Sequence, residues 1–341
     1  GEVLFEKLGL PTGKKNKSGF STDADTLESL SDRHPAIPMI LEYRFITKLK
    51  STFVDGLLNL VSAENDRIRT QFNQCVTATG RISSTEPNMQ NIPVRTQQGR
   101  EIRKAFIASE GNVLVDADYS QIELRLLAHI SGDEGMIAAF NSGKDIHRTT
   151  ASEVFRVPFA EVTSEQRSAA KAVNFGIVYG ISDFGLARNL DIPVKRASEY
   201  IKLYFDRYPG VKSYLEKSVE DAKRTGYAVT MFERRRSMLE LKSSNYNTRS
   251  FGERVAMNMP IQGTAADIIK LAMVKVSQIL KERGLKTKLI LQVHDELIFD
   301  VPKAEADEVV LLVHECMEQV AHLSVPLDAD VKVGHSWYET K

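Results

Sequence analysis

Cysteine and long apolar runs are both scarce in this chain of 341 residues. The two cysteines, Cys75 and Cys316, lie far apart and outside any Cys-x-x-Cys pair, which argues against a zinc ribbon or a disulfide framework. We therefore expect a reducing compartment. No run approaches the roughly 18 apolar residues that a membrane span requires, and no signal-peptide pattern opens the sequence, so we expect no membrane partner.

Net charge is also absent, because 45 Lys and Arg residues balance 45 Asp and Glu residues. A neutral total disfavours a nucleic-acid-binding protein at first sight, but phosphate responds to local charge. Residues 223–254 carry eight basic and three acidic side chains, whereas residues 295–341 carry eleven acidic side chains and three lysines. Lys14, Lys15 and Lys17 form a further basic stretch. Each run taken alone fits a solvated surface as well as a binding surface.

The composition is that of an ordinary globular protein, with 42% hydrophobic and 26% charged residues and a length that suits two or three domains. Because the chain begins with Gly1 and passes directly into an apolar pattern, we expect a fragment whose upstream part has been removed. The patterns predict helix, loop and helix over residues 1–60, short β pieces over 66–115, and helices over 121–225.

The remaining patterns predict a β-hairpin or irregular basic loop over residues 226–245 and a long helix over 248–283. A strand, a tight turn and a second strand follow over 289–301, then an amphipathic helix over 309–320 and a last strand over 327–333. Because strands cluster on both sides of a helical stretch, the expected fold class is α+β, with a β core interrupted by an all-helical insertion.

Two acidic clusters end strand-like apolar runs: Asp116 and Asp118 in the first, Asp295 and Glu296 in the second. Carboxylates are costly at the end of a core strand unless a cation meets them, and Mg²⁺ prefers such hard oxygen ligands. The pair of clusters therefore predicts either a metal centre or two unrelated turns. Taken alone, Asp118 fits a helix cap better and Asp295 fits a hairpin turn.

A basic and aromatic stripe follows a capping box at residues 163–166, which predicts a helix start. Arg167, Lys171, Phe175 and Tyr179 recur every four residues and share one helix face. The cations suit a polyphosphate and the aromatic rings suit a sugar or base. An amphipathic helix with snorkelling basic side chains is the alternative.

Two further segments are polar without an evident core role. Arg254, Asn258 and Gln262 recur at helical spacing and could follow a groove or a phosphate backbone. Residues 77–84 and 88–93 form polar stretches amid apolar sequence, which indicates a ligand surface.

These five segments, in this order, resemble the DNA polymerases of family A, the bacterial DNA polymerase I type. Residues 118–125 are similar to the family's motif A, residues 167–180 to motif B and residues 292–296 to motif C. The resemblance runs from about Cys75 to Trp337. It implies an α+β right-hand fold with an antiparallel β-sheet palm, helical fingers inserted in the palm, and a partial helical thumb.

The resemblance also implies a division of the chain: partial thumb 1–69, palm 70–123 and 255–341, and fingers 124–254. The upstream exonuclease-like and nuclease domains would be missing, and both nuclease activities with them. The implied function is template-directed addition of dNTPs to a primer 3′-hydroxyl with release of pyrophosphate. The implied partners are primer-template DNA and a dNTP, for a monomer in the bacterial cytoplasm, associated with the nucleoid.

In the family, two Mg²⁺ ions, for which Mn²⁺ can substitute, are held by residues matching Asp118, Asp295 and the carbonyl of Tyr119. One ion lowers the pKa of the primer hydroxyl, and the other binds the triphosphate and the leaving pyrophosphate. Glu296 would support this site. Lys171 would bind phosphate and could protonate the leaving group.

The other roles implied by the resemblance concern the nucleotide and the DNA. Arg167 would bind phosphate beside Lys171, and Glu123 would block a 2′-hydroxyl in a sugar pocket bounded by Phe175. Tyr179 would stack at the templating position and move when the fingers close. The remaining nucleotide contacts would be His147 and Gln121. The DNA contacts would be Arg81, Arg254, Asn258, Gln262 and His294, with Lys14, Lys15 and Lys17 on the duplex backbone.

One segment departs from the family pattern. Glu233 stands where Gly is common before the arginines 234–236, and Leu239 stands where Pro is common. Because Glu adopts positive φ less cheaply than Gly, the conformation of this loop is an open question.

Two alternatives stay open. A family A polymerase with substantial reverse-transcriptase activity fits the same motifs, which do not show tolerance for the template sugar. A DNA-binding module that has lost catalysis is disfavoured by the intact Asp118, Asp295, Arg167 and Lys171.

Overall fold

The computed structural model describes all residues except 14, 17, 18 and 95, and it divides into two compact units. The first unit contains residues 1–71 and 86–103, and the second contains residues 72–85 and 104–341. Two of the predicted DNA contacts, Lys14 and Lys17, therefore lie outside the described residues. Among the described residues, none of the helices is long and apolar enough to cross a membrane.

The first unit is mostly helical and has a small core that includes Leu4, Phe5, Leu27 and Ile37. The basic segment expected to be a loop contains two very short paired strands instead. The second helix predicted within residues 1–60 is a continuous run of α2, η2 and α3. In chain order the elements are η1 (Glu2–Lys7), β1 (Lys15–Asn16), β2 (Gly19–Phe20), α1 (Ala24–Glu28), α2 (Ala36–Lys48), η2 (Leu49–Asp55), α3 (Gly56–Leu58), η3 (Met89–Asn91) and α4 (Gln97–Glu101).

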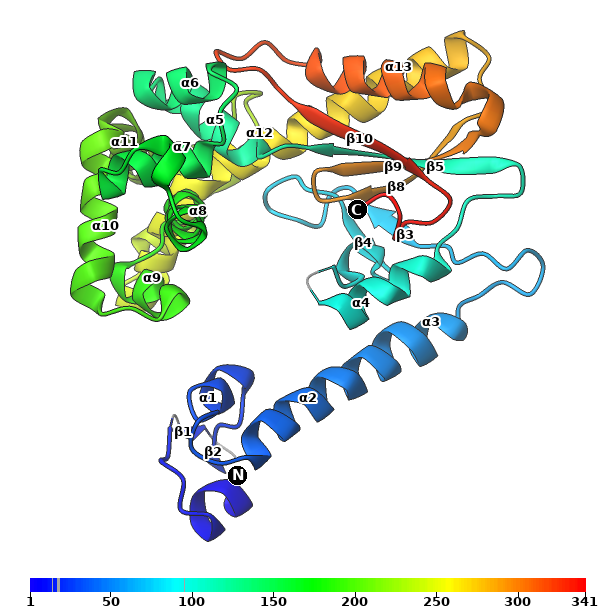
Figure 1. The fold of residues 1–341 in the computed structure, drawn as a ribbon. Coiled ribbons are helices and arrows are strands. Elements are labelled where there is room, and N and C mark those ends of the chain that lie inside the picture. Colours follow the sequence, from blue (N-terminus) through cyan, green and yellow to red (C-terminus); the bar gives the residue numbers. More distant parts are fainter. Residues whose placement is uncertain (14, 17–18, 95) are drawn as a thin grey trace. The chain divides into compact units, whose positions relative to one another are not determined.

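The second unit is built on a four-stranded antiparallel sheet with the strand order β10-β5-β9-β8 (Figure 1). The strands are β5 (Asn112–Tyr119), β8 (Lys288–Val293), β9 (Glu296–Pro302) and β10 (Ala329–Gly334). The central strand β5 therefore pairs with strands that lie far along the chain. This arrangement confirms an antiparallel sheet assembled from both sides of a helical insertion.

The helices expected over residues 121–225 are present, and so are the hairpin expected over 226–245 and the long helix expected over 248–283. The hairpin consists of β6 and β7, and α12 contains Pro260 in its interior. The elements of this region are α5 (Ile122–Ser131), α6 (Glu134–Asn141), α7 (Ile146–Phe155), η5 (Phe159–Glu161), α8 (Ser164–Val178), α9 (Asp183–Leu190), α10 (Val194–Arg207), α11 (Pro209–Thr225), β6 (Tyr227–Val229), β7 (Arg235–Ser237), η6 (Leu239–Lys242) and α12 (Tyr246–Glu282).

Helix α13 (Ala306–Glu318) packs on β5, β9 and β10 and covers one face of the sheet (Figure 1). Alternation along β5 sends Val115, Ala117 and Tyr119 into the main core and places Asp116 and Asp118 on the opposite face. The remaining short elements are β3 (Gln71–Asn73), which pairs with β4 (Ser83–Thr85), η4 (Ile102–Ala105) and η7 (Lys303–Glu305). The boundaries between the two units fall within β3 and η4.

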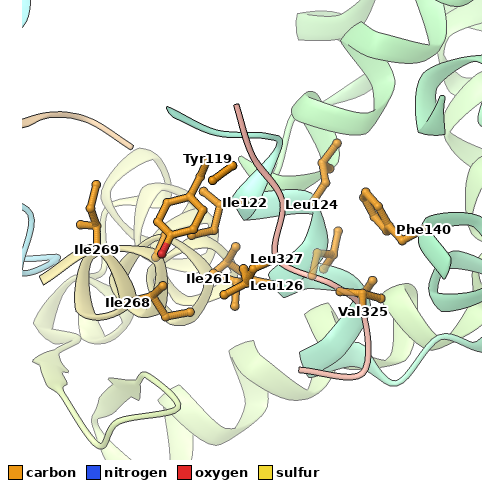
Figure 2. Packing of buried hydrophobic residues seen from close by; sticks show 14 of the residues in the cluster. Tyr119, Ile122, Leu124, Leu126, Phe140, Ile261, Ile268, Ile269, Val325 and Leu327 are labelled. Carbon is orange, nitrogen blue, oxygen red and sulfur yellow. The ribbon is translucent and has the colours of Figure 1, made fainter. Parts of the chain in front are cut away.

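Helix α5 joins the sheet to the helical insertion. Figure 2 shows Ile122 beside Tyr119 and near the α12 residues Ile261 and Ile268, whereas Leu124 lies nearer to Phe140 of α6. All of these side chains are buried in one cluster. Because α5 follows β5 after two residues, this packing fixes the direction in which the chain leaves the acidic end of the strand.

The loop between β6 and β7 contains Glu233, which stands where Gly is common, and the structure shows the backbone conformation at this position. Glu233 adopts φ 62°, the left-handed conformation that Gly accepts more cheaply. Its backbone N–H donates to the carbonyl of Thr230 at 3.1 Å, which closes the turn. The loop thus keeps a conformation suited to Gly although Glu occupies the position.

We predict that Glu233→Gly raises the free energy of unfolding by about 0.5–1 kcal/mol, because relief of left-handed strain exceeds the added entropy of the unfolded chain. Urea denaturation of the two proteins measures this difference. Glu233→Ala keeps the Cβ atom and serves as the matched control, which should not be stabilised. A glycine variant no more stable than the alanine variant would contradict the argument.

Candidate active site

The two acidic clusters meet at one end of the sheet. Strand β5 pairs with β9 so that Asp118 lies opposite Glu296. The backbone N–H of Tyr119 donates to the carbonyl of Asp295 at 3.2 Å, which ties the strand end to the β8–β9 turn. Sheet pairing therefore brings together carboxylates that are remote in sequence, as a shared metal centre requires.

The simpler interpretations of these acids are partly wrong. The N-cap residue of α5 is Gln121, which has φ 54° and makes no capping hydrogen bond through its side chain among the described residues, so Asp118 is not the helix cap. Asp295 does occupy the two-residue turn between β8 and β9, next to His294 with φ 56°. A turn position does not exclude a chemical role, because the Asp295 backbone carbonyl is hydrogen-bonded to Tyr119 at the end of β5.

The electrostatics of this end of the sheet favour a bound cation. Burial, followed by the negative charge of Asp118, raises the pKa of Asp295 to about 7. Burial also raises the pKa of Asp118, and together with Glu296 it raises the pKa of Asp116 to about 8. When ionised, these partly buried carboxylates repel one another, so a nearby positive charge would stabilise their ionised forms.

The donor set fits a divalent cation of the Mg²⁺ type. Asp118 Oδ1 is buried and has no hydrogen-bond partner among the described residues. A carboxylate oxygen left in this way is suited to a hard cation. In the part of the chain that the structure describes, no three His, Cys, Asp or Glu side chains are grouped to hold a metal. An ion bound by Asp118 and Asp295 would thus complete its shell with carbonyl, water or phosphate oxygens.

The predicted helix stripe is present on α8. Both hydrogen bonds of the capping box form, from Gln166 N–H to Thr163 Oγ1 at 3.1 Å and from Thr163 N–H to Gln166 Oε1 at 3.0 Å. Lys171, Phe175 and Tyr179 line one pocket of ≈ 680 Å³. Other residues that line the pocket include Ser182, Asn189 and Arg254.

Arg167 is the one member of the stripe that does not line this pocket. Its guanidinium binds Asp145 Oδ2 through Nε at 2.9 Å and Nη2 at 2.7 Å. Asp145 also caps α7 by accepting from Arg148 N–H at 2.8 Å. Sequence reasoning missed this partner, because a capping Asp gives no signal of its second contact.

His147 lies behind the stripe and is buried. Its ring centre is 5.6 Å from that of Phe175, and its Nδ1 lies 3.0 Å from Asn174 Nδ2. Burial, against the raising effect of the Asp145 charge and together with the positive charges of Lys171 and Arg167, lowers the pKa of His147 to about 4. His147 is therefore neutral at pH 7 and supports the Phe175 ring.

Glu123 connects the pocket to the acidic end of the sheet. Tyr179 donates its phenolic hydrogen to Glu123 Oε2 at 2.7 Å, and Arg81 Nη2 donates to Glu123 Oε1 at 2.7 Å. Arg81, Glu123, His294 and Asp295 line a second, much smaller hollow. Burial and the charge of Glu123 raise the pKa of Tyr179 above its usual range. The phenol is thus held in its neutral, donating form.

The other predicted contacts are distributed around these hollows. Asn258 Nδ2 donates to the Val178 carbonyl near the end of α8 at 3.3 Å, and Arg254 Nη1 donates to Ser250 Oγ at 3.0 Å. Gln121 and Gln262 are partly exposed, and His294 is exposed. Lys15 is exposed and belongs to the first unit.

Sequence reasoning also missed three residues that follow the last strand. Trp337 Nε1 donates to Glu296 Oε1 at 2.8 Å, and Thr340 Oγ1 donates to Asp116 Oδ2 at 2.9 Å. Lys341 Nζ lies 2.8 Å from Glu296 Oε2. No pattern in the sequence marks these partners, because they are joined to the acids only by folding.

Comparison with known proteins agrees with this geometry. The family model described as DNA polymerase family A matches residues 1–339, and the chain therefore belongs to that family. It is 56% identical over 339 residues to DNA polymerase I of Caldicellulosiruptor bescii, covering 99% of this chain and 40% of the relative. It is 55% identical to DNA polymerase I of Bacillus subtilis, covering 100% of this chain and 39% of that protein.

A solved structure has the same fold. The POL domain of Pol1 from M. smegmatis, in complex with DNA primer-template and dNTP, matches with a TM-score of 0.95 and 49% identity. The match covers 99% of this chain and 60% of that one. The expected α+β polymerase fold is confirmed. The chain spans about two fifths of the length of the curated relatives named above.

The depressed pKa of His147 makes stability depend on pH. Protonation favours the unfolded chain, so the contribution of neutral His147 is complete above pH 6.5 and is lost as the pH falls toward 4. The free energy of unfolding should fall for both proteins when the pH is lowered from 7 to 4.5. We predict that this fall is about 2 kcal/mol smaller for His147→Gln, which lacks the titrating group, than for the parent. Urea denaturation at several pH values measures this. Parallel pH profiles would contradict the prediction.

Proposed function

We propose that this chain adds dNTPs to a primer 3′-hydroxyl under the direction of a template strand, with release of pyrophosphate. The observation that carries the proposal is the convergence of Asp118 and Asp295 near a pocket lined by Lys171, Phe175 and Tyr179. Membership of DNA polymerase family A supports it. So does the likeness to the M. smegmatis domain described with primer-template and dNTP.

Asp118, Asp295 and the carbonyl of Tyr119 would hold two Mg²⁺ ions, for which Mn²⁺ can substitute. When bound, such ions lower the pKa of the attacking hydroxyl and neutralise charge on the triphosphate. The chain's part is to present the carboxylates. The β5–β9 register and the hydrogen bond from Tyr119 to Asp295 fix their spacing before substrate arrives. Glu296 would support them from the adjacent position on β9.

The stripe on α8 would receive the triphosphate. Lys171 lines the pocket and would bind phosphate there and supply a proton to the leaving pyrophosphate. Arg167 would exchange Asp145 for a phosphate oxygen, since its guanidinium is paired with that carboxylate in the free chain. Both steps use charge-assisted hydrogen bonds, which hold phosphate more strongly than neutral donors do.

Glu123 and Phe175 would bound the deoxyribose. Two hydrogen bonds of 2.7 Å hold the Glu123 carboxylate in one orientation, as a group that excludes a 2′-hydroxyl must be held. Tyr179 would stack at the templating position, and its hydrogen bond to Glu123 must break when it moves. Loss and recovery of this bond would couple nucleotide selection to closure of the helical region. Gln121 and His147 complete the proposed nucleotide site.

Residues 70–123 and 255–341 would form the palm, 124–254 the fingers and 1–69 part of the thumb. Primer and template would run past Arg81, Arg254, Asn258, Gln262 and His294, with Lys15 on the duplex backbone. We propose a monomer associated with the bacterial nucleoid. The related proteins named above are DNA polymerases and give no support to the reverse-transcriptase alternative.

Primer extension tests the proposal directly. The chain should extend a primed DNA template with dNTPs and Mg²⁺, and Asp295→Asn should reduce the rate at least about 10³-fold because a metal ligand is lost. The matched control is Asp307→Asn, an exposed acid at the start of α13, which should keep full activity. The metal assignment would be overturned by an Asp295→Asn variant that extends primers normally, and the proposed function by a parent chain that extends none.

The sugar pocket gives a second test. Glu123→Ala should raise the ratio of ribonucleotide to deoxyribonucleotide incorporation about 10- to 100-fold, because the space for a 2′-hydroxyl opens. Glu123→Gln is the matched variant, which keeps the side-chain volume and should retain most of the discrimination. Single-nucleotide insertion kinetics with dATP and ATP opposite template thymine measure the ratio. Equal ratios in the parent and the alanine variant would refute the sugar-pocket role.

A further inference from the structure

Three acids lie together on the face of the sheet opposite α13. Asp116 and Asp118 share this face of β5, and Glu296 lies opposite Asp118 on β9. Asp116 is only 2% exposed, and Glu296 is also buried. Buried carboxylates at this spacing require donors or a cation, because an uncompensated charge is expensive away from water.

The segment after β10 supplies these partners. Trp337 and Thr340 are buried neutral donors, and each binds one acid: Glu296 at 2.8 Å and Asp116 at 2.9 Å. Their burial holds the segment 337–341 against the acidic face. Indole and hydroxyl groups orient the carboxylates but leave the negative charge in place.

Lys341 brings the positive charge. Its Nζ lies 2.8 Å from Glu296 Oε2, 3.4 Å from Asp118 Oδ2 and 3.9 Å from Asp116 Oδ2. The side chain is 20% exposed. The ammonium thus contacts one oxygen of Asp118, whereas the other oxygen, Oδ1, is buried without a hydrogen-bond partner among the described residues.

We infer that Lys341 is a positioning residue that acts as an internal counter-cation of the Asp118–Glu296 pair and weakens divalent-ion binding in the free chain. It holds Asp118 through Oδ2 and leaves Oδ1 for the ion. A positive charge a few ångströms from a divalent cation repels it. Lys341 therefore lowers the affinity of the substrate-free protein for the ion. The inference rests on the proposed function, since it concerns the same acidic site.

The contact of Lys341 with the acids also affects how ion binding depends on substrate. An ion held weakly by the free chain depends more on oxygens that arrive with a triphosphate. Lys341 would thereby link stable occupation of the site to the presence of substrate. A residue that only anchored the segment would affect folding stability and leave the ion affinity of the folded chain unchanged.

Binding of Mn²⁺ to the metal-free 341-residue chain, without DNA or nucleotide, tests the inference by electron paramagnetic resonance. Lys341→Met should tighten Mn²⁺ binding about tenfold, because the repulsion is removed. Lys341→Arg keeps the charge and should stay within about twofold of the parent. Lys303→Met removes an exposed lysine from η7 and is the control for net charge, with no change expected.

Two further variants keep the outcomes distinct. Lys341→Gln is neutral and polar, and it replaces Lys341→Met if circular dichroism shows that the methionine variant is not folded. Asp118→Asn should abolish the measured binding. Binding that survives Asp118→Asn would overturn the proposed metal site itself. If Asp118→Asn abolishes binding but neutralising Lys341 leaves affinity unchanged or weakens it, the role of Lys341 alone is overturned.

Discussion

The pairing of β5 with β9 is the interaction on which the candidate site depends. This antiparallel register sets Asp118 opposite Glu296 and draws Asp295 to the end of β5 through one backbone hydrogen bond. A shift of one residue would turn Asp118 toward α13 and bury it in the main core. The apolar alternation of β5, with Val115 and Ala117 in that core, therefore protects the site by making any other register costly.

The second constraint is the way in which the helical insertion is attached to this sheet. Helix α5 packs against α12 and α6 (Figure 2). Its Glu123 accepts hydrogen bonds from Tyr179 and Arg81. The same short helix thus belongs to the core and to the site. Any movement of α8 in the proposed function must act on the hydrogen bond between Tyr179, which lines the proposed nucleotide pocket, and Glu123.

Local features were predictable from the sequence because their causes are local. The capping box at Thr163, the spacing of Lys171 and Phe175 on one helix face, and the hairpin before residue 240 all follow from neighbouring residues. The role of Asp118 was ambiguous for the same reason. A residue at the strand end and a helix cap differ only in where α5 begins, and α5 begins at Ile122, which packs in the main core. The resemblance to a family supplied the roles that spacing left open.

The sequence by itself determined the α+β class, the acidic strand ends and the basic-aromatic stripe, because periodicity and residue chemistry act over a few positions. Only the tertiary structure decided which charges meet. Arg167 is paired with Asp145, and Lys341 with Glu296 and Asp118, through contacts between elements that no sequence spacing relates. Asp116, an acid without a sequence-based role, is held by Thr340 across 224 positions. Such pairs form because burial makes an unpaired charge expensive, and folding alone determines which partner is within reach.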